Sequence, residues 1–141
     1  MEEPTVDEPR WGRIEELRRL ERCERGLAHA YRQRARAAPV YEAERLREAA
    51  EQHVWHADLL RRRMEALGGR GTEERDDDWI ARALHCEDPL RAAERESIAV
   101  YHDHLGDFDP TTAELVRDRI LADHERALTA LDPDRDHQSE V

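Results

Sequence analysis

Apolar residues recur at alternating intervals of three and four along the chain, which is the spacing of the buried seam of an amphipathic helix. The first such stretch predicts a helix over residues 11–38, which Pro39 ends because proline cannot continue a helix. The second predicts a helix over residues 40–67, closed by two glycines. The two predicted seams are Ile14, Leu17, Glu21, Glu24, Ala28, Tyr31 and Ala35, and Ala43, Leu46, Ala50, His53, Ala57, Leu60, Met64 and Leu67.

Two further helices are predicted over residues 89–105 and 110–131, with the turn "GDFDP" between them. Asp88 and Pro89 begin the third helix, because aspartate is a preferred N-cap and proline fits the first helical position. Its seam is Leu90, Glu94, Ser97, Tyr101 and His104, with Ile98 and Leu105 beside it.

The lengths of the connections predict how the four helices are ordered. The first and second helices, and the third and fourth, are joined by short turns, so each pair is expected to form an antiparallel hairpin. The longer connection between the hairpins contains "WIARALHC", which predicts a short helix. Such a connection can cross the length of a bundle and leave the second and third helices parallel. The predicted fold is therefore all-α, a four-helix bundle of two hairpins joined by one long crossover, which is the ferritin-like arrangement.

The two predicted hairpins match when one is laid over the other along the sequence, most distinctively where Glu24 falls on Glu94 and Tyr31 on Tyr101. Each hairpin also holds a glutamate and a histidine at similar distances from its turn. The apolar positions that match in the same register are Leu20 with Leu90, Leu46 with Val116, Ala50 with Ile120, and Ala57 with Ala127.

Glu24 and His53 stand on opposite sides of Pro39 at nearly equal distances along the chain. Glu94 and His124 stand at equal distances on opposite sides of Asp109. At about 1.5 Å per residue, each side chain is roughly 22 Å from its turn, so both pairs are expected to lie near the middle of the bundle. The spacing leaves open whether Asp123 or His124 faces the core.

A buried carboxylate must be paired, hydrogen-bonded or bound to a metal. One hypothesis is a metal-binding layer, in which His53 and His56 share one helix face because they are three positions apart. Three histidines and two glutamates suit Fe, Zn or Mn. The alternative is a layer without metal, in which each glutamate accepts hydrogen bonds from histidine. The candidate ligands are Glu24, His53, His56, Glu94 and His124.

Four segments carry a likeness to known proteins: "LERCERGLAHAYRQRA", "LRRRMEALGG", "AERESIAVY" and "ILADHERALTAL". Over residues 14–131 the sequence resembles the ferritin-like superfamily, and within it a bacterial family of four-helix-bundle proteins of uncharacterised function. The resemblance implies ligand glutamates at Glu24 and Glu94. His53 stands where the family has glutamate, and neither Asp123 nor His124 is followed by histidine three positions later. The bridging carboxylates of a di-iron ferroxidase are therefore not implied.

Charge and composition further limit the classes of partner and the cellular location that the sequence predicts. A net charge of −11 without a basic patch argues against a nucleic-acid partner. No apolar run reaches the roughly 20 residues of a membrane span, and no signal peptide is visible, so a cytoplasmic protein is expected. Cys23 and Cys86 lack the spacing of a disulfide framework or thiolate site.

The bundle is expected over residues 11–131, between an acidic mobile tail (1–10) and a polar tail (132–141). No nucleophilic triad, phosphate-binding loop or dinucleotide fingerprint is visible. Without metal, the protein would be a non-catalytic helical module that acts through self-association as a homo-oligomer or through protein partners.

Overall fold

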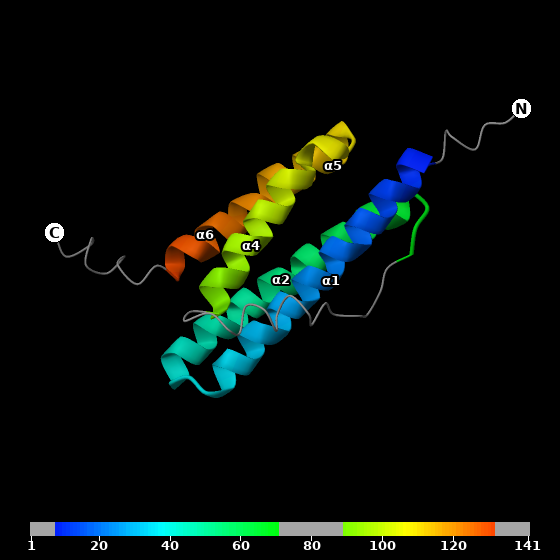
Figure 1. Ribbon diagram of the computed structural model, residues 1–141. Helices are drawn as coiled ribbons and strands as arrows, with labels where there is room; N and C mark the ends of the chain where they lie inside the picture. Colours follow the sequence, from blue (N-terminus) through cyan, green and yellow to red (C-terminus); the bar gives the residue numbers. More distant parts are fainter. Residues whose placement is uncertain (1–7, 71–88, 132–141) are drawn as a thin grey trace, which may run out of the picture. The chain divides into compact units, whose positions relative to one another are not determined.

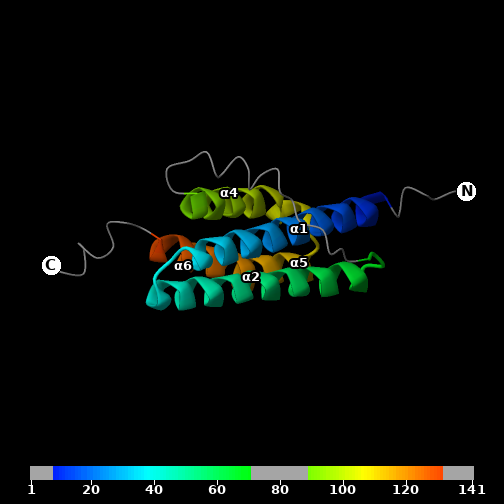
Figure 2. The same cartoon turned by 90° about the horizontal axis from the view of Figure 1, so that it is seen from below.

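In the computed structural model, the described residues are 8–70 and 89–131, and they are helical and contain no strand (Figures 1 and 2). This confirms the predicted all-α class for that part of the chain. The acidic residues 1–7, the predicted short helix, Asp88 and the polar tail after residue 131 lie outside it. The helices are α1 (Glu8–Arg36), α2 (Val40–Ala66), α4 (Pro89–His104), α5 (Pro110–Leu115), the π-helix η3 (Val116–Leu121) and α6 (Ala122–Ala130).

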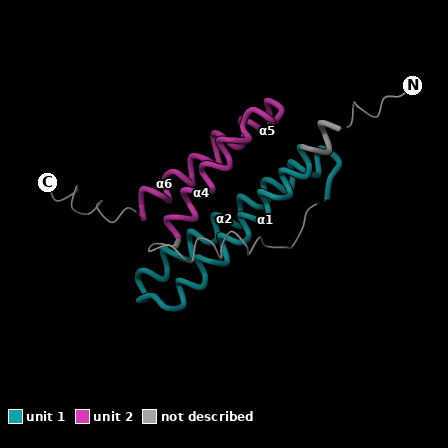
Figure 3. Tube along the Cα trace, in the orientation of Figure 1, with its two compact units in different colours: residues 1–80 teal, residues 81–141 magenta. Residues whose placement is uncertain are grey.

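The chain divides into two compact units, residues 1–80 and 81–141 (Figure 3). Each unit contains one of the two predicted helical hairpins. The crossover and the parallel second and third helices concern the placement of the units, and they stay predictions. Among the described residues, no helix is long and apolar enough to span a membrane.

In the first unit, α1 and α2 run side by side in opposite directions and are joined by a short turn at Pro39 (Figures 1 and 2). All predicted seam positions of α1 are buried, together with Leu20 and Leu27, which the narrow seam omitted. On α2 the predicted seam is buried as far as Met64, and Leu67 is half-buried. The apolar stripe on α1 is wider than a two-position seam, which is typical of a helix in a globular core.

The start of α1 corrects the predicted boundary of the acidic tail. The helix begins at Glu8, so residues 8–10 are helical and the predicted tail over residues 1–10 is too long. Proline does not exclude a helix here, because Pro9 lies in the first turn, where a missing N–H breaks no helical hydrogen bond.

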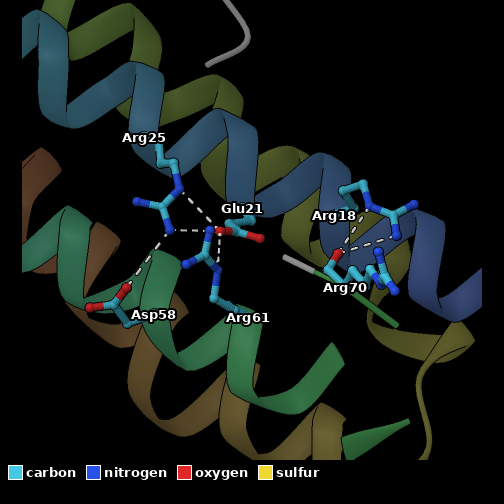
Figure 4. A network of polar contacts seen from close by, with 6 residues as sticks. All are labelled: Arg18, Glu21, Arg25, Asp58, Arg61 and Arg70. Carbon is cyan, nitrogen blue, oxygen red and sulfur yellow. Dashed lines mark hydrogen bonds and ion pairs between the residues drawn. The ribbon is translucent and has the colours of Figure 1, made fainter. Parts of the chain in front are cut away.

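The glycine pair Gly68–Gly69 ends α2 and brings the chain close to the beginning of α1. Gly68 has φ of 99°, a left-handed conformation that glycine adopts without strain. A Cβ on Gly69 would lie 2.6 Å from Cγ2 of Ile14 on α1 and 2.8 Å from Cγ of Met64 on α2, so any larger residue would force these side chains to shift. The Arg18 guanidinium donates from Nε and Nη2 to the carbonyl of Arg70, each at 3.2 Å (Figure 4).

In the second unit, α4 packs against α6 and η3, which continue the helical segment that begins with α5. The short 3₁₀ helix η2 (Leu105–Asp107) leads into the turn. Asp109 caps α5, because its carboxylate accepts hydrogen bonds from the backbone N–H of Thr112 at 3.3 Å and from its hydroxyl at 2.6 Å. On α4 the buried seam positions are Leu90, Glu94, Ser97 and Tyr101, while Ile98 and His104 are half-buried, as is Leu105 at the start of η2.

The predicted uninterrupted α-helix over residues 110–131 is wrong in one respect. Residues Val116–Leu121 form a π-helix, in which hydrogen bonds join residues five apart and one extra residue is accommodated. Both Asp123 and His124 are buried in the turn that follows, with exposed fractions of 7% and 0%. Periodicity could not choose between these two residues, and the structure buries both.

Candidate metal centre

The first unit holds a buried carboxylate that faces two imidazoles. Oε1 of Glu24 lies 2.9 Å from Nδ1 of His53 and 3.3 Å from Nδ1 of His56. All three side chains are at most 1% exposed. Glu24 comes from α1 and both histidines from α2, so the contact joins the two arms of the hairpin. The nearly equal distances from the turn correctly predicted that Glu24 and His53 would meet.

The two histidines share a face of α2 because they are three positions apart, and their ring centroids are 5.5 Å apart in an edge-on arrangement. Tyr31 lies against His53 with a centroid distance of 5.2 Å. Trp55 lies 6.0 Å from His56 and is partly exposed. These aromatic contacts restrict how either imidazole can turn, so the nitrogen atoms that face Glu24 are held in place.

The spacing of the donor atoms suits a single small cation. Glu24, His53 and His56 each offer one ligand atom, and these atoms lie within 4.8 Å of one another. In a tetrahedral zinc site with bonds of about 2.0–2.1 Å, two ligand atoms are about 3.3 Å apart. The carboxylate oxygen is already 2.9 Å and 3.3 Å from the two nitrogens. Small side-chain adjustments would therefore place all three around one ion.

A second buried carboxylate, one turn earlier on α1, has a different environment. Oε2 of Glu21 accepts hydrogen bonds from Arg25 at 2.7 Å and 3.0 Å, and from Arg61 at 3.1 Å (Figure 4). Asp58 lies 3.8 Å from Arg25 at the edge of the same network. Two guanidinium groups compensate the charge of Glu21, as a buried carboxylate requires. Glu21 is therefore a structural residue, whereas Glu24 is met by imidazoles, which are metal ligands.

The second unit contains a similar pair. Oε1 of Glu94 on α4 lies 2.6 Å from Nδ1 of His124 on α6, and both side chains are fully buried. The ring of Tyr101 lies 5.4 Å from that of His124, which matches the contact of Tyr31 with His53. Asp123 instead pairs with Arg126, whose side chain is largely exposed.

All the predicted ligands are thus buried, and Glu24 pairs with His53 and Glu94 with His124 as the distances from the turns predicted. The contact of His56 with Glu24 was not predicted from those distances. Whether the pairs of the two units form one layer stays a prediction.

Glu21 was predicted in the buried seam of α1, but its arginine partners were not predicted. Arg25 could have been predicted as a partner of Glu21, because side chains four positions apart on one helix are neighbours. Arg61 comes from the other helix, and no local spacing identifies it.

Comparisons of the chain with protein-family models, with curated proteins and with solved structures find no match. The resemblance to ferritin-like proteins therefore rests on the sequence segments alone.

Proposed function

We propose that this protein binds a divalent transition metal ion through Glu24, His53 and His56. The observation that carries the proposal is the arrangement of two imidazole nitrogens around one buried carboxylate oxygen, at distances close to those between the ligands of one ion. Two histidines and one carboxylate form a ligand set used for zinc and for non-haem iron. Three protein ligands leave further coordination positions for water or for another group.

The donor types narrow the range of metals. Imidazole nitrogen suits Zn, Fe and Cu, whereas Mg and Ca prefer sites made of oxygen atoms alone. Of the metals expected from the sequence, Zn²⁺ and Fe²⁺ fit this set better than Mn²⁺. An imidazole nitrogen that donates to Glu24 carries a proton, so before that nitrogen can bind a metal the imidazole must lose the proton or move it to the other ring nitrogen.

A second candidate function follows from the same distances. At 2.9 Å and 3.3 Å the imidazoles can donate hydrogen bonds directly to Glu24, which satisfies the carboxylate without an ion. The protein would then be a helical module that acts through self-association or protein partners. In that case, added metal would leave stability unchanged.

We also propose a ferritin-like bundle as the parent architecture. Two antiparallel helical hairpins and a long intervening connection support this proposal, together with the four sequence segments. The proposed metal site does not depend on it, because all three ligands belong to the first unit.

The test is metal titration of protein purified without an affinity tag, by calorimetry in two buffers of different ionisation enthalpy. We expect Zn²⁺ to bind, and the difference in heat between the two buffers measures how many protons the site releases. Glu24→Gln keeps the shape of the side chain but removes its charge, and it should weaken binding at least about tenfold, as should His56→Leu.

His102→Ala is the matched control, because His102 is exposed on α4 and should not affect this site. Equal binding by wild type and both ligand variants would contradict the proposed site. Loss of binding in the control alone would assign the metal to the surface.

A further inference from the structure

The second helical segment of each hairpin begins at a matching position. Laying Val40, where α2 begins, over Pro110, where α5 begins, also lays Glu24 over Glu94. The apolar positions near the start of the two segments keep this alignment, since buried Leu46 falls on buried Val116.

The histidines break this alignment. His53 and His124 have the same role, because each contacts the glutamate of its own hairpin and a tyrosine ring. In the register set by the glutamates, however, His53 falls on Asp123, and His124 lies one position later. The second hairpin therefore holds one residue more than the first between its turn and its histidine.

The added residue lies in η3. When the two hairpins are aligned on their glutamates, Ala50 falls on Ile120. When they are aligned on their histidines, Ala50 falls on Leu121. Both Ile120 and Leu121 are buried within η3. An α-helix turns by about 100° per residue, so one extra residue would rotate every later side chain by that angle. A π-helical turn takes up one additional residue before the α-helix resumes.

We infer that η3 is a one-residue insertion that positions His124, and not Asp123, opposite Glu94. In a regular α-helix of the same sequence, Asp123 would occupy the place that corresponds to His53 and its carboxylate would face that of Glu94. Two adjacent carboxylates repel each other and one of them takes up a proton. With η3 in place, Glu94 meets an imidazole, and Asp123 pairs with Arg126.

The insertion also determines the chemistry of the pair. A glutamate and a histidine supply one oxygen and one nitrogen donor, whereas a glutamate and an aspartate would supply oxygen alone, which favours Mg or Ca. The metal binding proposed above belongs to Glu24, His53 and His56 of the first unit, so the positioning of His124 does not depend on it.

The test is deletion of Asp118, an exposed residue in the middle of η3. If η3 holds one residue too many for an α-helix, the deletion converts it to a regular helix and leaves His124 facing Glu94. We expect the melting temperature of the metal-free protein to stay within about 4 °C of wild type. The matched control is deletion of Glu48, the equivalent exposed residue of α2. That deletion should lower the melting temperature by more than about 10 °C, because it turns His53 and Leu60 away from the core.

The contact itself is followed by NMR of the histidine ring nitrogens in metal-free protein, with the His124 signals assigned by His124→Gln. Glu94→Gln should shift these signals in the wild type and in the Asp118 deletion alike. The inference is overturned if the Asp118 deletion is as damaging as the Glu48 deletion. It is also overturned if Glu94→Gln no longer affects His124 in the shortened protein. Neither measurement involves metal, so failure of the proposed metal binding would leave both unaffected.

Discussion

Replacing His53 with leucine in metal-free protein isolates the energy of the buried Glu24–His53 contact. Both side chains are 1% exposed, and the atoms that meet are 2.9 Å apart. Leucine fills much of the space of the imidazole but cannot donate a hydrogen bond. The carboxylate of Glu24 then stays buried with one of its partners removed.

Leaving a buried charged group without one of its partners costs about 3–5 kcal/mol. The lower end applies here, because His56 still lies 3.3 Å from the same carboxylate oxygen. We therefore expect His53→Leu to lower the free energy of unfolding by about 3 kcal/mol. For a chain of 141 residues this is a fall in melting temperature of roughly 10 °C. Replacing Glu24 and His53 together with leucine should recover most of the loss, because no carboxylate is then left buried.

The assay is urea denaturation followed by far-UV circular dichroism in the presence of chelator, for wild type, both single variants and the double variant. His102→Leu is the control for adding leucine at an exposed histidine, and it should change stability by less than about 0.5 kcal/mol. A loss below about 1 kcal/mol for His53→Leu, or additive effects of the two single variants, would refute the argument.

Two further predictions concern the hairpin ends. Gly69→Ala should destabilise by roughly 1–3 kcal/mol, because its Cβ would overlap Ile14, whereas Gly106→Ala should be nearly neutral because nothing lies within 4 Å of the added atom. Thermal melts of the two variants check this, and equal melting temperatures would contradict it. Asp109→Ala should cost about 1 kcal/mol through loss of the helix cap on Thr112, and Asp109→Ser should restore most of it. Urea denaturation measures both, and a neutral alanine variant would show that the cap contributes nothing.

Most of the fold within each unit could be predicted from the sequence because the information is local. Residue spacing shows which face of a helix is buried, and Pro39 and the glycine pair mark where α2 begins and ends. The contact of Glu24 with His53 was predictable too, since an antiparallel hairpin pairs residues at equal distances from its turn. All these predictions concern regular helices, in which the position of a side chain follows directly from the number of residues that separate it from the turn.

Residue spacing did not predict the contacts where the helix is irregular or where the partner residue comes from another helix. The π-helix η3 shifts the register by one residue, so the sequence alone could not decide between Asp123 and His124. The arginine pair around Glu21 includes Arg61 from the neighbouring helix, and several arginines on that helix could have been the partner. The sequence could not establish metal binding either, because the same two histidines can donate hydrogen bonds in a metal-free core or coordinate an ion.

The proposed metal site is tested most directly by the melting temperature of the untagged protein with excess Zn²⁺ and with chelator. A ligand that binds only the folded state stabilises it by about 2.7 kcal/mol when its free concentration is about 100-fold above the Kd. We therefore expect the wild type to melt several degrees higher with Zn²⁺ than with chelator, and Glu24→Gln to lose most of that difference. Identical melting temperatures of the wild type in Zn²⁺ and in chelator would contradict the proposal and leave Glu24, His53 and His56 as a hydrogen-bonded core.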